Sequence, residues 1–97
     1  MATRREVSWA LGARQDLKDI VDYIAVTNPL AAQEWLADVL ERAGKLNQYP
    51  EMGRAIPETA NVRYRELMMG DYRIFYEVTI REIRIFGILH SRRLFLS

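Results

Sequence analysis

The 97-residue sequence contains no cysteine, only one histidine and only two lysines. The absence of cysteine excludes a disulfide framework, a thiolate zinc site and a cysteine nucleophile. One histidine excludes a histidine-rich cage, so we expect neither a metal site nor a cofactor. The longest apolar run, residues 85–89, is far shorter than the roughly 20 residues that span a bilayer. No apolar signal segment follows the first charged residues, so the sequence predicts a cytoplasmic protein without a membrane partner.

The charged residues are nearly balanced, with 14 basic and 13 acidic side chains and a net charge of +1. Twelve of the basic residues are arginine, and seven of these lie in residues 63–97. Arginine is favoured over lysine for bidentate contacts to carboxylate or phosphate and for buried ion pairs. The C-terminal part could therefore face nucleic acid or an acidic protein, although the total charge is too small for non-specific coating of DNA.

The length predicts a single domain over residues 1–97. Alternating apolar residues in 4–9 predict a short strand. Apolar residues at helical spacing predict one helix over about 10–27 and a second over about 29–47. Asn28-Pro29 is a capping residue followed by the residue favoured at the first helical position, so the two helices should form an antiparallel hairpin.

The remainder of the chain predicts a sheet. Proline and glycine interrupt residues 48–62, which we expect to form a loop. Three segments rich in Tyr, Ile, Phe and Val follow and predict an antiparallel meander. They are residues 63–69, 72–79 and 82–90. The predicted fold is α+β, in the order β-α-α-β-β-β, with the helical hairpin on one face of a small, mainly antiparallel sheet and the other face uncovered.

The strands and the segment after them carry the residues best suited to chemistry. Arg73 and Arg93 could stabilise a phosphorane-like transition state, with His90 as an acid or base near neutral pH, which would be metal-free RNA cleavage. Phosphates or a target protein could also be bound by three further arginines, which are Arg63, Arg65 and Arg92. Alternatively, Arg73 and Arg84 form ordinary cross-strand ion pairs with Glu77 and Glu82, and His90 is a structural residue at a strand end.

Other candidates have a simpler interpretation. Asp16, Asp19 and Asp22 could form a metal-binding face, but their helical spacing is typical of a solvated helix surface. Trp35 has the spacing of a packing residue.

The last residues are unusually apolar for a chain end. They are Leu94, Phe95 and Leu96, followed by one serine. Such a segment could cover the edge of the chain's own core, or it could be the docking surface for a partner segment.

Five short motifs occur in order over nearly the whole chain. They are Ala13-x-x-Asp16-Leu17-x-x-Ile20-x-x-Tyr23-Ile24, Asn28-Pro29-x-Ala31-Ala32, Leu46-x-x-x-Pro50-x-x-Gly53-Arg54, Tyr72-Arg73-Ile74-x-Tyr76-x-Val78 and His90-Ser91-Arg92-Arg93. In this order they resemble the RelE/ParE superfamily of bacterial toxins from type II toxin–antitoxin modules. The resemblance implies a growth-inhibiting toxin, of the plasmid stabilization type, that a cognate antitoxin neutralises by wrapping its C-terminal segment around it. It also implies that operator DNA is bound only through the antitoxin.

Two branches of the superfamily differ in chemistry. RelE-like members cleave mRNA on the ribosome with a cluster of basic residues, whereas ParE-like members poison DNA gyrase without hydrolysis. By resemblance, Arg73 matches an arginine of the RelE-like branch, Arg92 or Arg93 falls near its second catalytic arginine, and Arg63 and Arg65 could replace lysines. No tyrosine follows the single histidine, and the helical hairpin resembles the ParE-like branch more closely. We therefore expect a gyrase poison, with a ribosome-dependent RNase, an inactivated toxin and a non-catalytic interaction domain as the alternatives.

Overall fold

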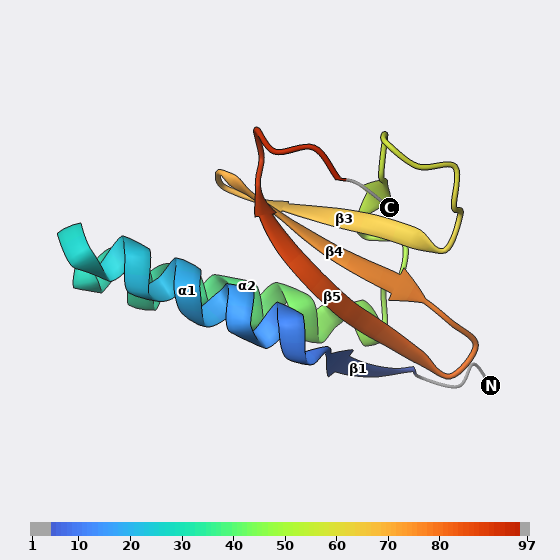
Figure 1. Ribbon diagram of the computed structural model, residues 1–97. Coiled ribbons are helices and arrows are strands. Elements are labelled where there is room, and N and C mark those ends of the chain that lie inside the picture. The colour runs from blue at the N-terminus through green and yellow to red at the C-terminus, as the bar shows by residue number, and fades with distance from the viewer. Residues whose placement is uncertain (1–4, 96–97) are drawn as a thin grey trace.

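The structure is a computed structural model, and it describes residues 5–95 of the chain. One strand leads into two helices, and the remaining strands follow them (Figure 1). The elements are β1 (Glu6–Trp9), α1 (Leu11–Thr27), α2 (Pro29–Gly44), the short 3-10 helix η1 (Lys45–Asn47), β2 (Arg54–Ala55), β3 (Tyr64–Met69), β4 (Tyr72–Val78) and β5 (Glu82–His90). The predicted order is confirmed, with β2 as an additional strand inside the segment that was expected to be a loop.

One residue ends the first helix and begins the second. The backbone N–H of Asn28 donates to the Ile24 carbonyl oxygen at 3.0 Å, which closes α1. The Asn28 side chain accepts a hydrogen bond from the Ala31 N–H at 3.0 Å, and Pro29 occupies the first turn of α2. Asparagine satisfies a backbone donor that the helix itself leaves unpaired, and proline has no N–H to satisfy. The helices therefore turn back on one another with no intervening loop.

The strands form one sheet in the order β1-β5-β4-β3-β2. β1 is parallel to β5, and the other neighbours are antiparallel. The pairing of β4 with β5 contains a bulge, because Phe75 stands opposite Gly87 while Tyr76 stands opposite Ile85. Phe86 is thus an extra residue on β5, and it shifts the alternation of the strand by one position. As a result Ile85 before the bulge and Ile88 after it both face the helices.

The main core lies between the helical hairpin and the sheet. Val39 and Leu46 from the helical part are fully buried against Ile74 and Ile83 of the sheet. Trp35 packs against this cluster and its ring lies 5.2 Å from that of Tyr72, so the packing role predicted for it is confirmed. None of the helices within residues 5–95 is long and apolar enough to cross a membrane.

The opposite face of the sheet is also covered, so the expectation of an uncovered face is wrong. Ile56 and Phe95 are buried there against Phe75 of β4. The C-terminal tail returns from the end of β5 across this face toward the loop before β3 (Figure 1). Of the terminal apolar residues, Phe95 covers the chain's own core, Leu94 is 70% exposed, and Leu96 lies outside the described residues.

Candidate functional site

Arg73 lies in the middle of the sheet, on the face that points away from the helices. In the register of the strands it stands between Met68 of β3 and Leu89 of β5. Its neighbours Tyr72 and Ile74 pack toward the helical hairpin, so the alternation of the strand places Arg73 on the other side. Only 5% of its surface is exposed. Burial of a guanidinium is unfavourable unless its charge and its N–H groups are paired.

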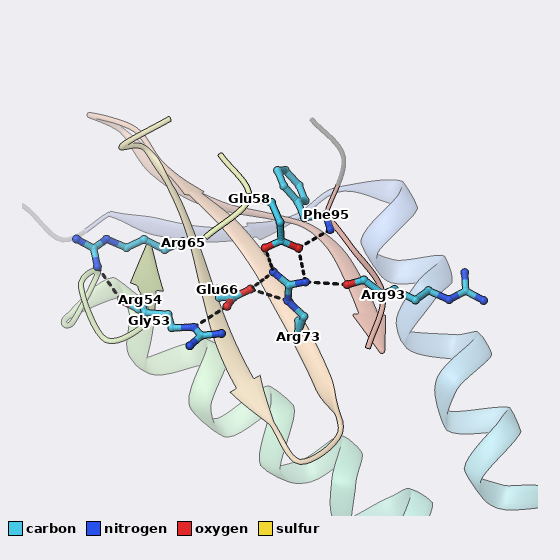
Figure 2. Close-up of polar contacts among 8 residues, drawn as sticks. All are labelled: Gly53, Arg54, Glu58, Arg65, Glu66, Arg73, Arg93 and Phe95. Atoms are coloured by element: carbon cyan, nitrogen blue, oxygen red, sulfur yellow. Dashed lines mark hydrogen bonds and ion pairs between the residues drawn. The ribbon is translucent and has the colours of Figure 1, made fainter. Parts of the chain in front are cut away.

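Every nitrogen of this guanidinium has an acceptor within the chain (Figure 2). Nε donates to Glu66 Oε1 at 2.7 Å, and Nη2 lies 2.7 Å from the same oxygen. Nη2 and Nη1 donate to the two oxygens of Glu58 at 2.6 and 2.7 Å. Nη1 also donates to the backbone carbonyl of Arg93 at 2.8 Å, while the Arg93 side chain points away from this centre (Figure 2).

Glu58 links three parts of the chain. Its carboxylate binds Arg73 on β4, and its Oε2 also accepts a hydrogen bond from the Phe95 N–H of the tail at 2.7 Å. The hydrogen bonds from Arg73 and then from Phe95 lower the pKa of Glu58 from 4.5 to about 2. In return, the hydrogen bond to Glu58 raises the pKa of the Arg73 guanidinium, which stays charged. The loop, the sheet and the tail are therefore joined through one ionised carboxylate.

The network continues along the edge of the sheet. The second oxygen of Glu66 accepts a hydrogen bond from Arg54 Nε of β2 at 2.6 Å. Arg65 Nη1 donates to the Gly53 carbonyl at 2.7 Å, and the Gly53 N–H donates to the Tyr76 hydroxyl at 2.9 Å. Burial raises the pKa of Tyr76, so its hydroxyl stays neutral and can act as both donor and acceptor. These bonds fix the loop against the sheet and explain why the two-residue strand forms.

His90 lies at the far end of β5, in a different environment from this network. It stands opposite Tyr72, and the two rings meet edge to face with centroids 5.5 Å apart. Its Nδ1 accepts a hydrogen bond from the Arg92 backbone N–H at 3.2 Å. A cavity of about 370 Å³ beside it is also lined by Arg93 and Asp16. Asp19 and Tyr72 also line this cavity, and burial raises the pKa of Tyr72. The cavity therefore combines an imidazole, a neutral phenol, a guanidinium and two carboxyl groups.

The strand register separates the candidate basic residues from one another. Arg65 and His90 occupy positions that face the helical side, whereas Arg73 faces away. Arg63 lies with Arg65 beside a cavity near the turn between β4 and β5, and Arg92 is exposed beside His90 at the other end. The candidate residues therefore do not form one cluster, because successive residues of a strand point to opposite sides.

The simple cross-strand pairing considered for the arginines is not what the structure contains. Arg73 binds two other glutamates in place of Glu77 and Glu82. Arg84 stands opposite Glu77 in the register, but within residues 5–95 the two side chains form no ion pair. Glu82 accepts a hydrogen bond from the Ser8 hydroxyl of β1 at 2.9 Å.

The aspartates of α1 have separate roles. Within residues 5–95 no group of three or more His, Asp or Glu side chains could hold a metal ion. Asp22 forms an exposed ion pair with Lys18 at 2.8 Å, which raises the pKa of that lysine. Asp16 is only partly exposed, and it accepts a hydrogen bond from the Ile88 N–H just after the bulge at 3.0 Å. The solvated face predicted for these residues is thus wrong for Asp16, which ties the first helix to the last strand.

Glu58 and Glu66 are the residues that sequence reasoning missed. Glu66 stands opposite Phe75, which makes it a diagonal neighbour of Arg73 on the same face. The period of two and the strand register could have found it. Glu58 lies in an irregular loop, where no periodicity marks its direction.

Comparison with known proteins identifies the family of this fold. Residues 7–95 match the family described as the ParE toxin of the type II toxin–antitoxin system parDE. A curated relative, Toxin RelE2 of Caulobacter vibrioides, is 38% identical over 90 residues, which cover 92% of this chain and 98% of the relative. The chain therefore belongs to the ParE toxin family of type II toxin–antitoxin systems, within the RelE/ParE superfamily that its motifs resemble.

Two solved structures share the fold. One is described as the chromosomal ParDE system from P. aeruginosa, with a TM-score of 0.77, 24% identity, and coverage of 92% of this chain and 98% of that one. The other is the toxin–antitoxin complex RelBE2 from Mycobacterium tuberculosis, with a TM-score of 0.64, 21% identity, and coverage of 93% and 94%. At these identities the likeness supports the architecture and not the chemistry of the site.

Proposed function

We propose that this chain, as a single toxin domain in the cytoplasm, inhibits growth by poisoning DNA gyrase and is neutralised by a cognate antitoxin. The observation that carries the proposal is the state of Arg73. Its guanidinium is buried, and each of its nitrogens is paired within the chain, so it stabilises the fold and is not open to a phosphate. Membership of the ParE family also supports a non-hydrolytic mechanism.

A ribosome-dependent RNase is the second candidate, and one observation favours it. The cavity beside His90 brings an imidazole and the Arg93 guanidinium to the same small space. A general acid or base and a cation are the groups that metal-free cleavage at a 2′-hydroxyl requires. In that case the catalytic residues would be His90 and Arg93, with Arg92 beside them for phosphate binding, and Arg73 would position the tail.

The apolar cavity at the tip of the hairpin suits the antitoxin. It has a volume of about 700 Å³, and its lining includes Val26 of α1, Trp35 of α2 and Tyr72 of β4. Val26 is among the most exposed large apolar residues of the described chain. Apolar surface of this kind marks sites of protein association. We assign it to the antitoxin segment, because the solved relatives include a toxin–antitoxin complex; contact with operator DNA would then come from the antitoxin.

The deciding experiment is to induce the chain without an antitoxin and to measure chromosomal double-strand breaks within minutes. Breaks that disappear in a strain with a resistant gyrase would support the proposal. Growth arrest with an intact chromosome and cut mRNA would refute it in favour of the RNase.

Variants sharpen the comparison between the two mechanisms. His90→Ala and Arg93→Ala should leave killing unchanged if gyrase is the target, and should abolish it if the cavity is catalytic. Arg93→Ala is informative because it keeps the backbone carbonyl that binds Arg73. Arg73→Ala is unsuitable, since loss of killing would follow from loss of the fold.

A further inference from the structure

Two adjoining cavities lie at the end of the sheet opposite to His90. The first has a volume of about 660 Å³ and is formed around the turn between β4 and β5. The second has a volume of about 450 Å³, and the two share Arg5, Arg63 and Val78 in their linings. The nine residues of β5 separate this end from His90, a distance of roughly 30 Å for an extended strand. It is therefore distinct from the cavity beside His90 and from the apolar cavity at the tip of the hairpin.

The guanidinium groups here differ from that of Arg73, because most of their N–H donors have no acceptor among residues 5–95. Arg63 and Arg81 line the first cavity, and their side chains form no hydrogen bond or ion pair with residues 5–95. Within the same described residues, Arg5 donates only from Nε, to the Thr79 carbonyl at 2.7 Å. Exposed guanidinium groups that converge on a cavity are suited to bidentate binding of carboxylate or phosphate.

Two apolar side chains stand beside these arginines. Ile80 in the turn is 92% exposed, and Val62 before β3 is 88% exposed. Ile80 lines the first cavity and Val62 the second. Arginine together with exposed apolar side chains is the composition of protein-binding surfaces. We call these residues the sheet-end surface: Arg5, Val62, Arg63, Ile80 and Arg81.

The acidic residues at the same place decide what kind of anion fits. Glu6 and Glu82 line the first cavity, and Glu51 lines the second. A continuous phosphate backbone would lie against these carboxylates and be repelled. Separate carboxylates on a peptide can instead bind the arginines at positions between the glutamates. The net charge of only +1 also disfavours a polyanion.

We propose that the sheet-end surface binds an acidic protein segment, with its carboxylates paired to Arg63 and Arg81 and its apolar side chains packed on Val62 and Ile80. This binding does not depend on which cellular target the toxin has. It would add a partner surface to the apolar cavity at the opposite end of the molecule.

The test uses the full chain and a fluorescent twelve-residue peptide of alternating Glu and Leu, with binding followed by anisotropy. The double variant Arg63→Glu/Arg81→Glu should weaken binding about tenfold or more, because two charge-assisted contacts become repulsive. Arg14→Glu, on the exposed side of α1, is the matched control and should bind like the wild type. The backbone N–H and carbonyl of Arg63, which bind Asn61 and Val78, are unchanged by the substitution, so the double variant should fold, as circular dichroism would verify.

Three further comparisons complete the design. Binding should fall with added salt and should be absent for a peptide of alternating Gln and Leu. Equal binding of the Glu-Leu peptide by wild type and double variant, or no binding at all, would overturn the proposal. Tighter binding of a twelve-nucleotide single strand than of the Glu-Leu peptide would overturn it in favour of a nucleic-acid surface.

Discussion

Replacing Arg73 by methionine should strongly lower the free energy of unfolding. The sheet itself should keep its geometry. The substitution removes every hydrogen bond of the guanidinium, and it leaves Glu66, whose side chain is fully buried, with one unpaired oxygen. Breaking a buried ion pair from one side costs about 3–5 kcal/mol, because the remaining charge is desolvated. A domain of this size is stable by only about 5–15 kcal/mol. The melting temperature should therefore fall by at least about 12 °C.

Urea unfolding followed by circular dichroism measures this directly. Arg84→Met is the matched control: it lies on an adjacent strand, is exposed, and should change the free energy of unfolding by no more than about 0.5 kcal/mol. The double variant Arg73→Met/Glu66→Met should recover part of the loss, because it also removes the fully buried carboxylate of Glu66. A loss below about 1 kcal/mol for Arg73→Met would refute the reasoning, since it would mean that water reaches the network.

Three other predictions follow from single contacts. The pKa of Glu58 is lowered from 4.5 to about 2, so its contribution to stability is complete above pH 4.5 and is lost as the pH falls toward 2; Glu58→Gln should flatten this dependence in urea titrations. A Cβ at Gly53 would lie 2.5 Å from a strand carbonyl oxygen, so Gly53→Ala should lower the free energy of unfolding by about 1–3 kcal/mol. Its control is Gly12→Ala, in open space within α1, which should raise the free energy of unfolding slightly. Asp16→Ala removes the acceptor of the Ile88 N–H and should lower the free energy of unfolding by about 1–3 kcal/mol in the same assay. An unchanged free energy of unfolding would contradict this and would mean that water replaces the carboxylate.

The helices and the meander were predictable because their signals are local. Apolar spacing sets the buried face of each helix, and Asn28-Pro29 sets the boundary between them. The parallel pairing of β1 with β5 was not predictable, because it joins residues more than 70 positions apart and depends on the packing of α1. β2 was missed because two residues carry no period, and bonds from outside the strand hold it in place.

The candidate site was only partly predictable, and the missing step was the direction of side chains. The motifs singled out Arg73, His90 and Arg93, but composition alone does not say on which face each residue lies. The period of two within β4, combined with the pairing of β5, would have placed His90 and Arg73 on opposite faces. The two separate environments of these residues follow from that alternation.

The role of Arg73 could not be predicted without knowing where the C-terminal tail lies. A guanidinium on an open face would be solvated and available to a ligand, whereas one on a covered face must find partners within the chain. Phe95 covers part of this face, and its N–H is bound by the same Glu58 carboxylate that binds Arg73. Each contact is a condition for the other, and Glu58 belongs to a loop without a pattern. A periodic signal describes one element at a time, so it could not reveal a bond that exists only after the loop, the sheet and the tail have come together.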